Sequence, residues 1–114
     1  MSQLITLEQA VEMTTRFRDE KEGILDTEYQ NENILANSET FQRGVIDQVL
    51  EQSGCTGLRV YYGMDEELRV HAILVGVNSS NADILTLMEN DQPLIVEDGT
   101  RCPEDCPPTS DLNP

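Results

Sequence analysis

The feature that most constrains the fold is a change in hydrophobic periodicity halfway along the chain. Apolar Leu58, Val60 and Tyr62 alternate with their neighbours at the period of two that is typical of a half-buried strand. Residues 69–77, RVHAILVGV, form an almost continuous apolar run, as expected of a central strand. The intervening residues 63–67, GMDEE, have the composition of a turn. This segment therefore predicts an antiparallel β-hairpin.

A first helix is predicted before the hairpin, because apolar residues recur there at helical spacing. Thr6 followed by Gln9 has the pattern of a capping box, which marks the start of a helix. Gly23 is a suitable stop. The stripe that should face the core consists of Leu7, Ala10, Val11 and Phe17, continued beyond the helix by Ile24 and Leu25.

A second helix is predicted from Phe41 to Gln52, with Ser38 or Thr40 as its N-cap. Residues 26–39 lie between the two helices, contain three asparagines and show no sustained period. We expect them to form an ordered surface loop.

The region after the hairpin is predicted to contain a short helix around Ala82–Met88 and a third, edge strand at Pro93–Val96. The resulting fold class is α+β, with two N-terminal helices packed on one face of a small, mainly antiparallel three-stranded sheet. Residues 1–98 would form a single domain. Residues 99–114 would form an acidic, irregular tail rich in cysteine and proline.

The charge balance argues against several classes of partner. The chain has 22 acidic and 7 basic residues and a net charge of −15, so nucleic-acid backbones and anionic membranes should repel it. Residues 78–114 hold eight acids and one base, and the segment from Asp83 to Asp111 is a candidate surface for a protein partner with a basic surface. A solvated face that only keeps the protein soluble is the ordinary alternative. Mimicry of DNA is a further one.

Membrane insertion and secretion are not indicated by the sequence. The longest apolar run, residues 72–77, is far shorter than the roughly 18 residues of a membrane helix. The first ten residues lack the basic and apolar regions of a secretory signal. We therefore expect a cytoplasmic protein with reduced thiols.

The pair Cys102 and Cys106 is the most prominent chemical feature of the tail. Its spacing lacks the second pair of ligands that zinc ribbons and fingers use, and it is not the Cys-x-x-Cys of redox centres. Glu104 and Asp105 lie between the two thiols and should raise their pKa values. Locking of the tail, by a disulfide or by packing, is the favoured interpretation. A metal site with Cys102 and Cys106 as ligands and a redox or regulatory role stay open.

Cys55 and His71 complete the set of residues that could bind zinc. In the predicted hairpin Cys55 lies far from the turn and His71 close to it, so one site cannot hold both. We interpret Cys55 as a small residue at a helix-to-strand joint and His71 as structural. The chain also lacks the phosphate-binding, nucleophile-elbow and zinc-protease motifs. No catalytic residue and no cofactor are predicted.

The run GLRVYYGMDEELRVHAILVGVN and the tail RCPEDCPP resemble small, uncharacterised single-domain bacterial proteins. The resemblance spans roughly Phe41 to Pro108. It implies a free-standing intracellular domain and no particular activity, cofactor or site residue.

The sequence thus favours a small acidic cytoplasmic protein that acts by macromolecular interaction and not by catalysis. The alternatives are a thiol- or metal-dependent function that uses Cys102 and Cys106, and mimicry of DNA. An exposed edge strand would also allow a homodimer.

Overall fold

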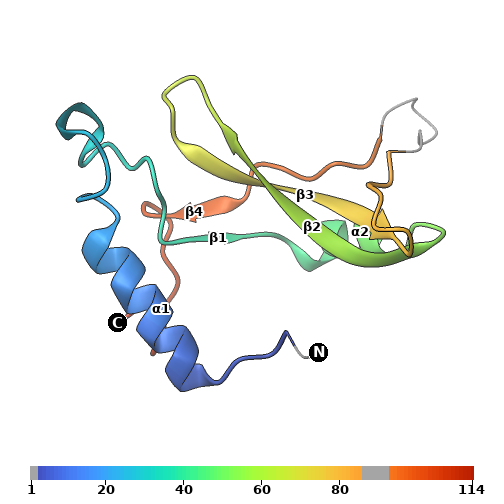
Figure 1. Cartoon of the computed structure of the whole chain (residues 1–114), viewed down its shortest axis with the longest axis horizontal. Helices are drawn as coiled ribbons and strands as arrows, with labels where there is room; N and C mark the ends of the chain where they lie inside the picture. Colours follow the sequence, from blue (N-terminus) through green and yellow to red (C-terminus); the bar gives the residue numbers. More distant parts are fainter. Residues whose placement is uncertain (1–2, 86–92) are drawn as a thin grey trace. The chain divides into compact units, whose positions relative to one another are not determined.

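The computed structural model describes residues 3–85 and 93–114, and its chain divides into two compact units (Figure 1). We call Met1–Ser38 with Arg101–Pro114 the terminal unit, and Glu39–Thr100 the hairpin unit. Each unit is described by itself. Residues 86–88 of the predicted short helix lie outside the described residues.

The terminal unit begins with helix α1 (Leu7–Glu20), and the predicted capping box is confirmed. The Thr6 hydroxyl accepts a hydrogen bond from the Gln9 backbone N–H at 3.0 Å, and the Gln9 side chain accepts one from the Thr6 N–H at 2.9 Å. The helix ends at Glu20, before the expected stop at Gly23. None of its side chains is buried, although their spacing predicted an inward stripe.

The asparagine-rich loop after α1 contains a short 3-10 helix, η1 (Thr27–Tyr29). Asn31 and Asn33 have positive φ angles of 64° and 57°, a backbone conformation that asparagine tolerates better than most residues. Ile34 is the buried apolar anchor of this loop. These observations agree with the expected ordered surface loop.

Two three-residue strands, β1 (Ser38–Thr40) and β4 (Thr100–Cys102), pair with each other and were not predicted. The boundary between the two units runs through both strands. Because Ser38 and Thr40 lie in β1, neither caps the second helix. The prediction of such a cap is wrong.

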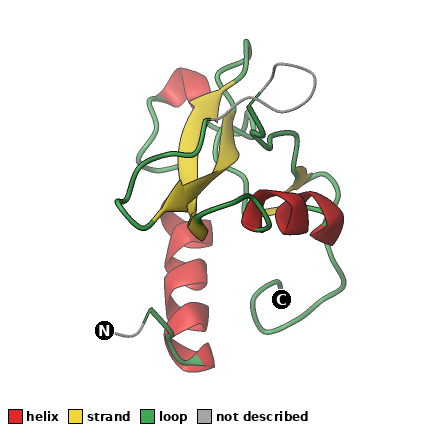
Figure 2. Ribbon diagram, turned by 90° about the vertical axis from the view of Figure 1, so that its right-hand side faces the viewer, coloured by secondary structure: helices red, strands yellow, loops and turns green. Residues whose placement is uncertain are grey.

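The hairpin unit contains helix α2 (Arg43–Leu50), shorter at both ends than predicted, with Gln42 as its N-cap. Strands β2 (Cys55–Met64) and β3 (Val70–Asn78) follow and pair antiparallel, which confirms the predicted hairpin. The register runs evenly from Leu58 opposite Gly76 to Met64 opposite Val70. Figure 2 shows the two strands twisted about each other.

The predicted three-stranded sheet is wrong, because the described strands form two separate two-stranded sheets. Of the expected third strand Pro93–Val96, only Val96 pairs with β3, exchanging backbone hydrogen bonds of 2.8 and 2.9 Å with Leu74. Two other segments occupy the neighbouring positions on that edge. The Ile84 N–H donates to the Gly76 carbonyl at 2.8 Å, and the Ala72 N–H donates to the Glu39 carboxylate at 2.9 Å.

The residues after β3 that the structure describes are not helical, in contrast to the prediction. Asn78 folds this segment into a turn, because its side-chain oxygen accepts hydrogen bonds from the N–H groups of Ser80 and Ala82. Asp83 then forms an isolated bridge with Val77. The Ile84 N–H bonds to the Gly76 carbonyl and not to the carbonyl four residues before it, so no helical turn forms at this point.

The core of the hairpin unit lies where α2 meets the hairpin. Val49, Leu74 and Val96 are buried together, with Phe41, Ile46 and Leu94 packed around them. Val49 is completely inaccessible to solvent. A helix packed on an antiparallel pair of strands confirms the predicted α+β class, with one helix and two whole strands in the described part of this unit in place of the predicted two helices and three strands.

Val49→Ala should lower the free energy of unfolding by about 2 kcal/mol, from two lost methyl groups and the cavity they leave. Urea unfolding followed by circular dichroism measures this change. Val45→Ala is the matched control, because Val45 lies on the same helix with 36% of its surface exposed. Equal effects of the two substitutions would contradict the assigned core.

Candidate functional site

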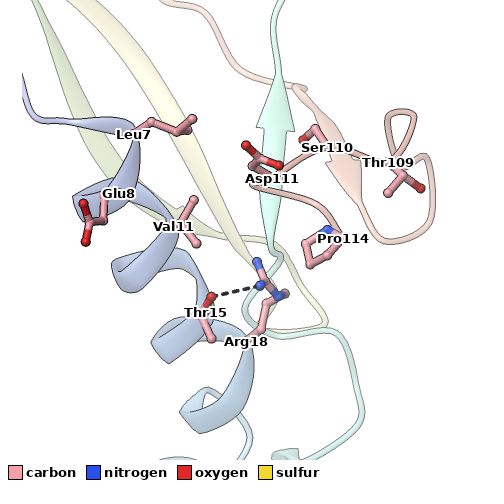
Figure 3. A pocket seen from close by; sticks show the side chains of 9 residues that line it. All are labelled: Leu7, Glu8, Val11, Thr15, Arg18, Thr109, Ser110, Asp111 and Pro114. Carbon is pink, nitrogen blue, oxygen red and sulfur yellow. Dashed lines mark hydrogen bonds between the residues drawn. The ribbon is translucent and has the colours of Figure 1, made fainter.

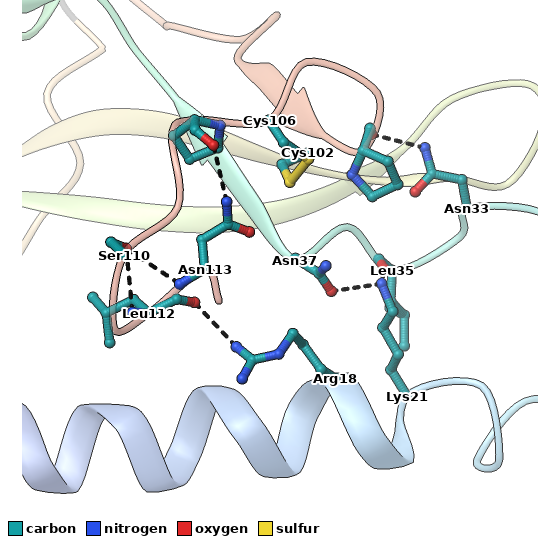
Figure 4. Close-up of a disulfide and its surroundings, with 12 residues drawn as sticks. Arg18, Lys21, Asn33, Leu35, Asn37, Cys102, Cys106, Ser110, Leu112 and Asn113 are labelled. Atoms are coloured by element: carbon teal, nitrogen blue, oxygen red, sulfur yellow. Dashed lines mark hydrogen bonds between the residues drawn. A yellow bond between two sulfur atoms is a disulfide. The ribbon is translucent and has the colours of Figure 1, made fainter.

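The cysteine pair of the tail forms a disulfide between Cys102 and Cys106, with the two Cα atoms 4.5 Å apart (Figure 4). Of the alternatives left open by the sequence, the structure thus shows the disulfide. Cys102 is 1% exposed, whereas Cys106 lies at the surface. Both sulfur atoms are committed to each other in this state, so neither is a thiolate that could bind a metal ion.

Hydrogen bonds fasten the tail to the loop after α1. The Asn37 N–H donates to the Cys102 carbonyl at 2.7 Å, and the Asn33 side chain donates to the Pro103 carbonyl at 3.1 Å. In the other direction, the Arg101 guanidinium of the tail donates to the Asn33 and Ile34 carbonyls at 3.0 and 3.2 Å. Arg18 of α1 reaches the Leu112 carbonyl at 3.0 Å. The tail is therefore an integral part of the terminal unit, held at several points along its length (Figure 4).

An open groove of about 850 Å³ lies between α1 and the last residues of the tail (Figure 3). Arg18 crosses the space between the two walls, because its guanidinium donates to the Leu112 carbonyl of the tail. It also donates to the Thr15 hydroxyl of α1 at 3.2 Å. The groove is lined by Leu7, Glu8, Val11, Thr15, Arg18, Thr109, Ser110, Asp111 and Pro114. Its aliphatic and mixed-charge lining offers contact surface and no recognisable catalytic grouping.

A second site lies in the hairpin unit, at the turn between β2 and β3. Asp65 organises this turn, because its Oδ1 atom accepts hydrogen bonds from the backbone N–H groups of Glu67 at 2.9 Å and Arg69 at 3.0 Å. Its Oδ2 atom lies 3.1 Å from Arg69 Nε and 2.8 Å from His71 Nε2. The carboxylate thus links the turn to the first residues of β3.

The imidazole of His71 lies between two carboxylates. Its Nε2 atom contacts Asp65, and its Nδ1 atom is 3.2 Å from Glu97 Oε1, without the geometry of a good hydrogen bond. The side chain is 18% exposed. Both ring nitrogens thus face carboxylates, and Nδ1 makes no hydrogen bond to a described residue. The imidazole therefore links the turn to Glu97, and the structural role expected of His71 stays a prediction.

A pocket of about 200 Å³ opens beside this cluster. Ile73 supplies an aliphatic wall, and Asp65 and Glu97 supply carboxylates. Glu97 is half-exposed and contacts the imidazole through one of its two oxygens. Among the described residues, no group of three or more side chains is arranged to hold a metal ion. The pocket can accept a slender cationic side chain.

The electrostatics of Asp65 are dominated by the hydrogen bond from His71. This bond, with the backbone N–H groups of Arg69 and Glu67, holds the pKa of Asp65 well below its ordinary value and outweighs the opposing effect of desolvation. Asp65 is therefore ionised throughout the neutral and mildly acidic range.

The acids of the candidate surface from Asp83 to Asp111 are divided between the two units. Asp83 is engaged by the Tyr61 hydroxyl and the Arg59 guanidinium, which lower its pKa in that order of importance. Glu89 and Asp91 lie outside the described residues. The remaining acids are all exposed but belong to different units, with Glu97 and Asp98 in the hairpin unit and Glu104, Asp105 and Asp111 in the terminal unit.

Cys55 begins β2, and its thiol donates a hydrogen bond to the Gly57 carbonyl at 3.3 Å. A Cβ atom placed at Gly76 would come within 2.9 Å of the Cys55 sulfur, so the two strands need glycine there. The register pairs Cys55 with Asn78 and Gly63 with His71, which puts Cys55 and His71 about 23 Å apart at roughly 3.3 Å per residue. The prediction that no single zinc site joins these two residues is confirmed.

The association of His71 with Asp65 and Glu97 was not predicted. An Asp at the start of a hairpin turn, six residues before a histidine on the returning strand, is the signal that could have indicated the first contact. Glu97 reaches His71 through the isolated bridge between Val96 and Leu74, which no local sequence pattern marks.

Comparison with known proteins gives no relative: no family model, curated protein or solved structure matches the chain. The resemblance to small bacterial proteins therefore stays a prediction. Within the described residues, neither helix is long and apolar enough to cross a membrane.

The depressed pKa of Asp65 gives a pH prediction. A carboxyl whose pKa is lowered by folding adds stability above its unfolded pKa, near 3.8, and this stability is lost as the pH falls further toward the folded pKa. The urea midpoint of the wild type should therefore fall more steeply below pH 4 than that of Asp65→Asn. Glu66→Gln, on the exposed part of the same turn, is the control and should follow the wild type.

Reduction of the disulfide should lower the stability of the terminal unit by up to about 2 kcal/mol, the loop-closure estimate for a ring of this size. Hydrogen exchange of residues 101–108 with and without a phosphine reductant measures the change. Cys55→Ser should respond to the reductant as the wild type does. An oxidised and a reduced protein with the same exchange rates would show that the hydrogen bonds alone hold the tail.

Proposed function

We propose that this chain is a non-catalytic binding protein whose acidic surface docks a protein partner with a basic surface. The observation that carries the proposal is the pocket beside His71. It combines an aliphatic wall with carboxylates at the end of the hairpin, next to further exposed acids of the turn.

The pocket suits the side chain of a lysine or arginine. Ile73 can contact its aliphatic stem, because long cationic side chains pack their stems along apolar surface. Asp65 already accepts hydrogen bonds on both oxygens, from His71, Arg69 and the turn backbone. Glu97 has the greater spare capacity, so we assign to it the ion pair with the incoming group.

Exposed Glu66 and Glu67 lie on the turn next to this pocket and extend the negative surface. Their position favours a partner segment with more than one basic residue. Surface charges of this kind mainly raise the rate of association and fix the orientation of the partner. The binding should therefore weaken steeply with salt.

The two alternatives have less support. A thiol- or metal-dependent function of Cys102 and Cys106 would require the disulfide to open, and one of its sulfurs is buried. Mimicry of DNA would require free carboxylates spaced along one face like phosphates, and Asp83 of the 83–111 segment is engaged by the Tyr61 hydroxyl and the Arg59 guanidinium. A cytoplasmic location likewise stays a prediction, since structural disulfides persist mainly in oxidising compartments.

The proposal is tested by the triple substitution Glu66→Gln, Glu67→Gln and Glu97→Gln. The probe is a fluorescent nonapeptide with alternating arginine and alanine, measured by anisotropy in 50 and 200 mM salt. Each lost exposed pair should weaken binding by roughly 1.4- to fivefold, corresponding to about 0.2–1 kcal/mol. The salt dependence should become shallower at the same time.

The matched control is Glu8→Gln, Glu20→Gln and Glu28→Gln, three exposed acids of the terminal unit. This variant has the same net charge as the test variant. If both triple variants bind equally, attraction is due to total charge and the pocket has no part in it. If the wild type does not bind the peptide even in 50 mM salt, the proposed function is wrong.

A further inference from the structure

The two outer edges of the hairpin differ in their hydrogen bonding to the other described residues of the hairpin unit. On the edge away from β2, the N–H and C=O of Leu74 both bond to Val96. The backbone groups of Leu74 therefore point away from β2. In an antiparallel ladder this makes Val60, its partner in the register, point its own N–H and C=O away from β3, toward the outer edge of β2.

Every second residue along the two strands directs its backbone N–H and C=O in the same way. The Gly76 carbonyl and the Ala72 N–H form hydrogen bonds on the edge of β3 that faces away from β2. Their partners in the register, Leu58 and Tyr62, therefore also direct their backbone groups toward the outer edge of β2. Met64 continues this alternation. Within residues 3–85 and 93–114, no segment pairs with the outer edge of β2. We call these four alternate residues the outer edge residues.

The side chains of the outer edge residues are apolar and exposed: Tyr62 is 80%, Met64 63%, Val60 44% and Leu58 40% accessible. They lie on the face of the hairpin that also carries the buried Leu74. β2 contains no proline, no lysine and no bulge from residue 58 onward. These are the devices by which edge strands normally avoid pairing with another chain.

Charge indicates what occupies this edge. The chain as a whole has a net charge of −15, yet β2 contains one arginine and no acid. Arg59 is moreover paired with Asp83 inside the unit. A basic partner segment would gain nothing from such a strand, whereas a second copy of the chain meets no repulsion along it.

We propose that two copies of this chain pair through antiparallel β2 strands, related by a two-fold axis at Tyr61. This register is the one that uses all four outer edge residues. Val60 then lies opposite Tyr62 of the second copy, and Leu58 opposite Met64 of the second copy. Each of these pairs forms twice, and β-branched–aromatic neighbours across strands are favourable.

The antiparallel arrangement also separates the acidic turns. Asp65 of one copy lies opposite Gly57 of the other, so the two turns are about 26 Å apart at roughly 3.3 Å per residue. This distance exceeds the Debye length of about 8 Å at physiological salt. Parallel pairing would bring the two turns together and is disfavoured.

The first test compares the wild type with Val60→Lys/Tyr62→Lys by sedimentation velocity over a range of concentrations. The wild type should show a monomer–dimer equilibrium. The variant places lysines directly opposite one another, so its dissociation constant should rise by at least about tenfold. Val45→Lys/Leu50→Lys, two exposed apolar residues of α2, is the control and should dimerise as the wild type does. A wild type that is monomeric at every concentration overturns the proposal.

The second test examines the register by cross-linking in a Cys55→Ser background. Position 61 faces itself across the axis, so Tyr61→Cys should form an intermolecular disulfide on mild oxidation. Thr56→Cys is the control, because two residues at position 56 would be about 33 Å apart. Cross-linking of both variants to the same extent, or of neither in a dimeric sample, overturns the proposed pairing. Neither test depends on binding to the basic peptide.

Discussion

The antiparallel ladder between β2 and β3 is the interaction on which the rest of the hairpin unit depends. β3 takes part in hydrogen bonds on both edges and carries Leu74 and Val75, two of the buried apolar side chains of the described residues. Gly76 leaves room on this strand for Cys55 and for Gln52, which follows α2, since a Cβ atom there would come within 2.9 and 3.1 Å of their side chains. The ionised Asp65 fixes the turn and with it the register. A shift by one residue would move the side chains of one strand to the opposite face of the hairpin.

The terminal unit is stabilised in a different way. Its described residues include only Ile34 and Cys102 as buried apolar side chains, and α1 buries none. A 14-residue helix without a packed face is marginal in water, so its ends and polar contacts have to supply the stability. Lys21 donates to the Leu35 carbonyl at 2.9 Å and the Asn37 side chain at 2.7 Å, and burial lowers its pKa. The disulfide adds a covalent link to these polar contacts.

The elements that could be predicted are those whose stabilising contacts lie between residues close together in the sequence. The capping box of Thr6 and Gln9 and the period of two in β2 are satisfied within a few residues, and both were confirmed. Strands β1 and β4 were missed because three residues are too few to show a period. The third strand failed because the free edge of β3 is divided among Val96, Ile84 and Glu39, and only tertiary structure decides that competition. The pocket beside His71 was missed for the same reason, since Glu97 arrives through one such contact.

The chain leaves the terminal unit after Ser38 and returns to it at Arg101, so the hairpin unit is an insertion within the terminal unit. This order has a consequence for synthesis on the ribosome. Residues 39–100 are contiguous and can fold as soon as they emerge, whereas α1 and its loop precede by many residues the tail that they bind. At roughly 5–20 residues per second, translation of the insert takes about 3–12 seconds. During that interval the first 38 residues lack residues 101–114, so the terminal unit can form only after the hairpin unit has been synthesised.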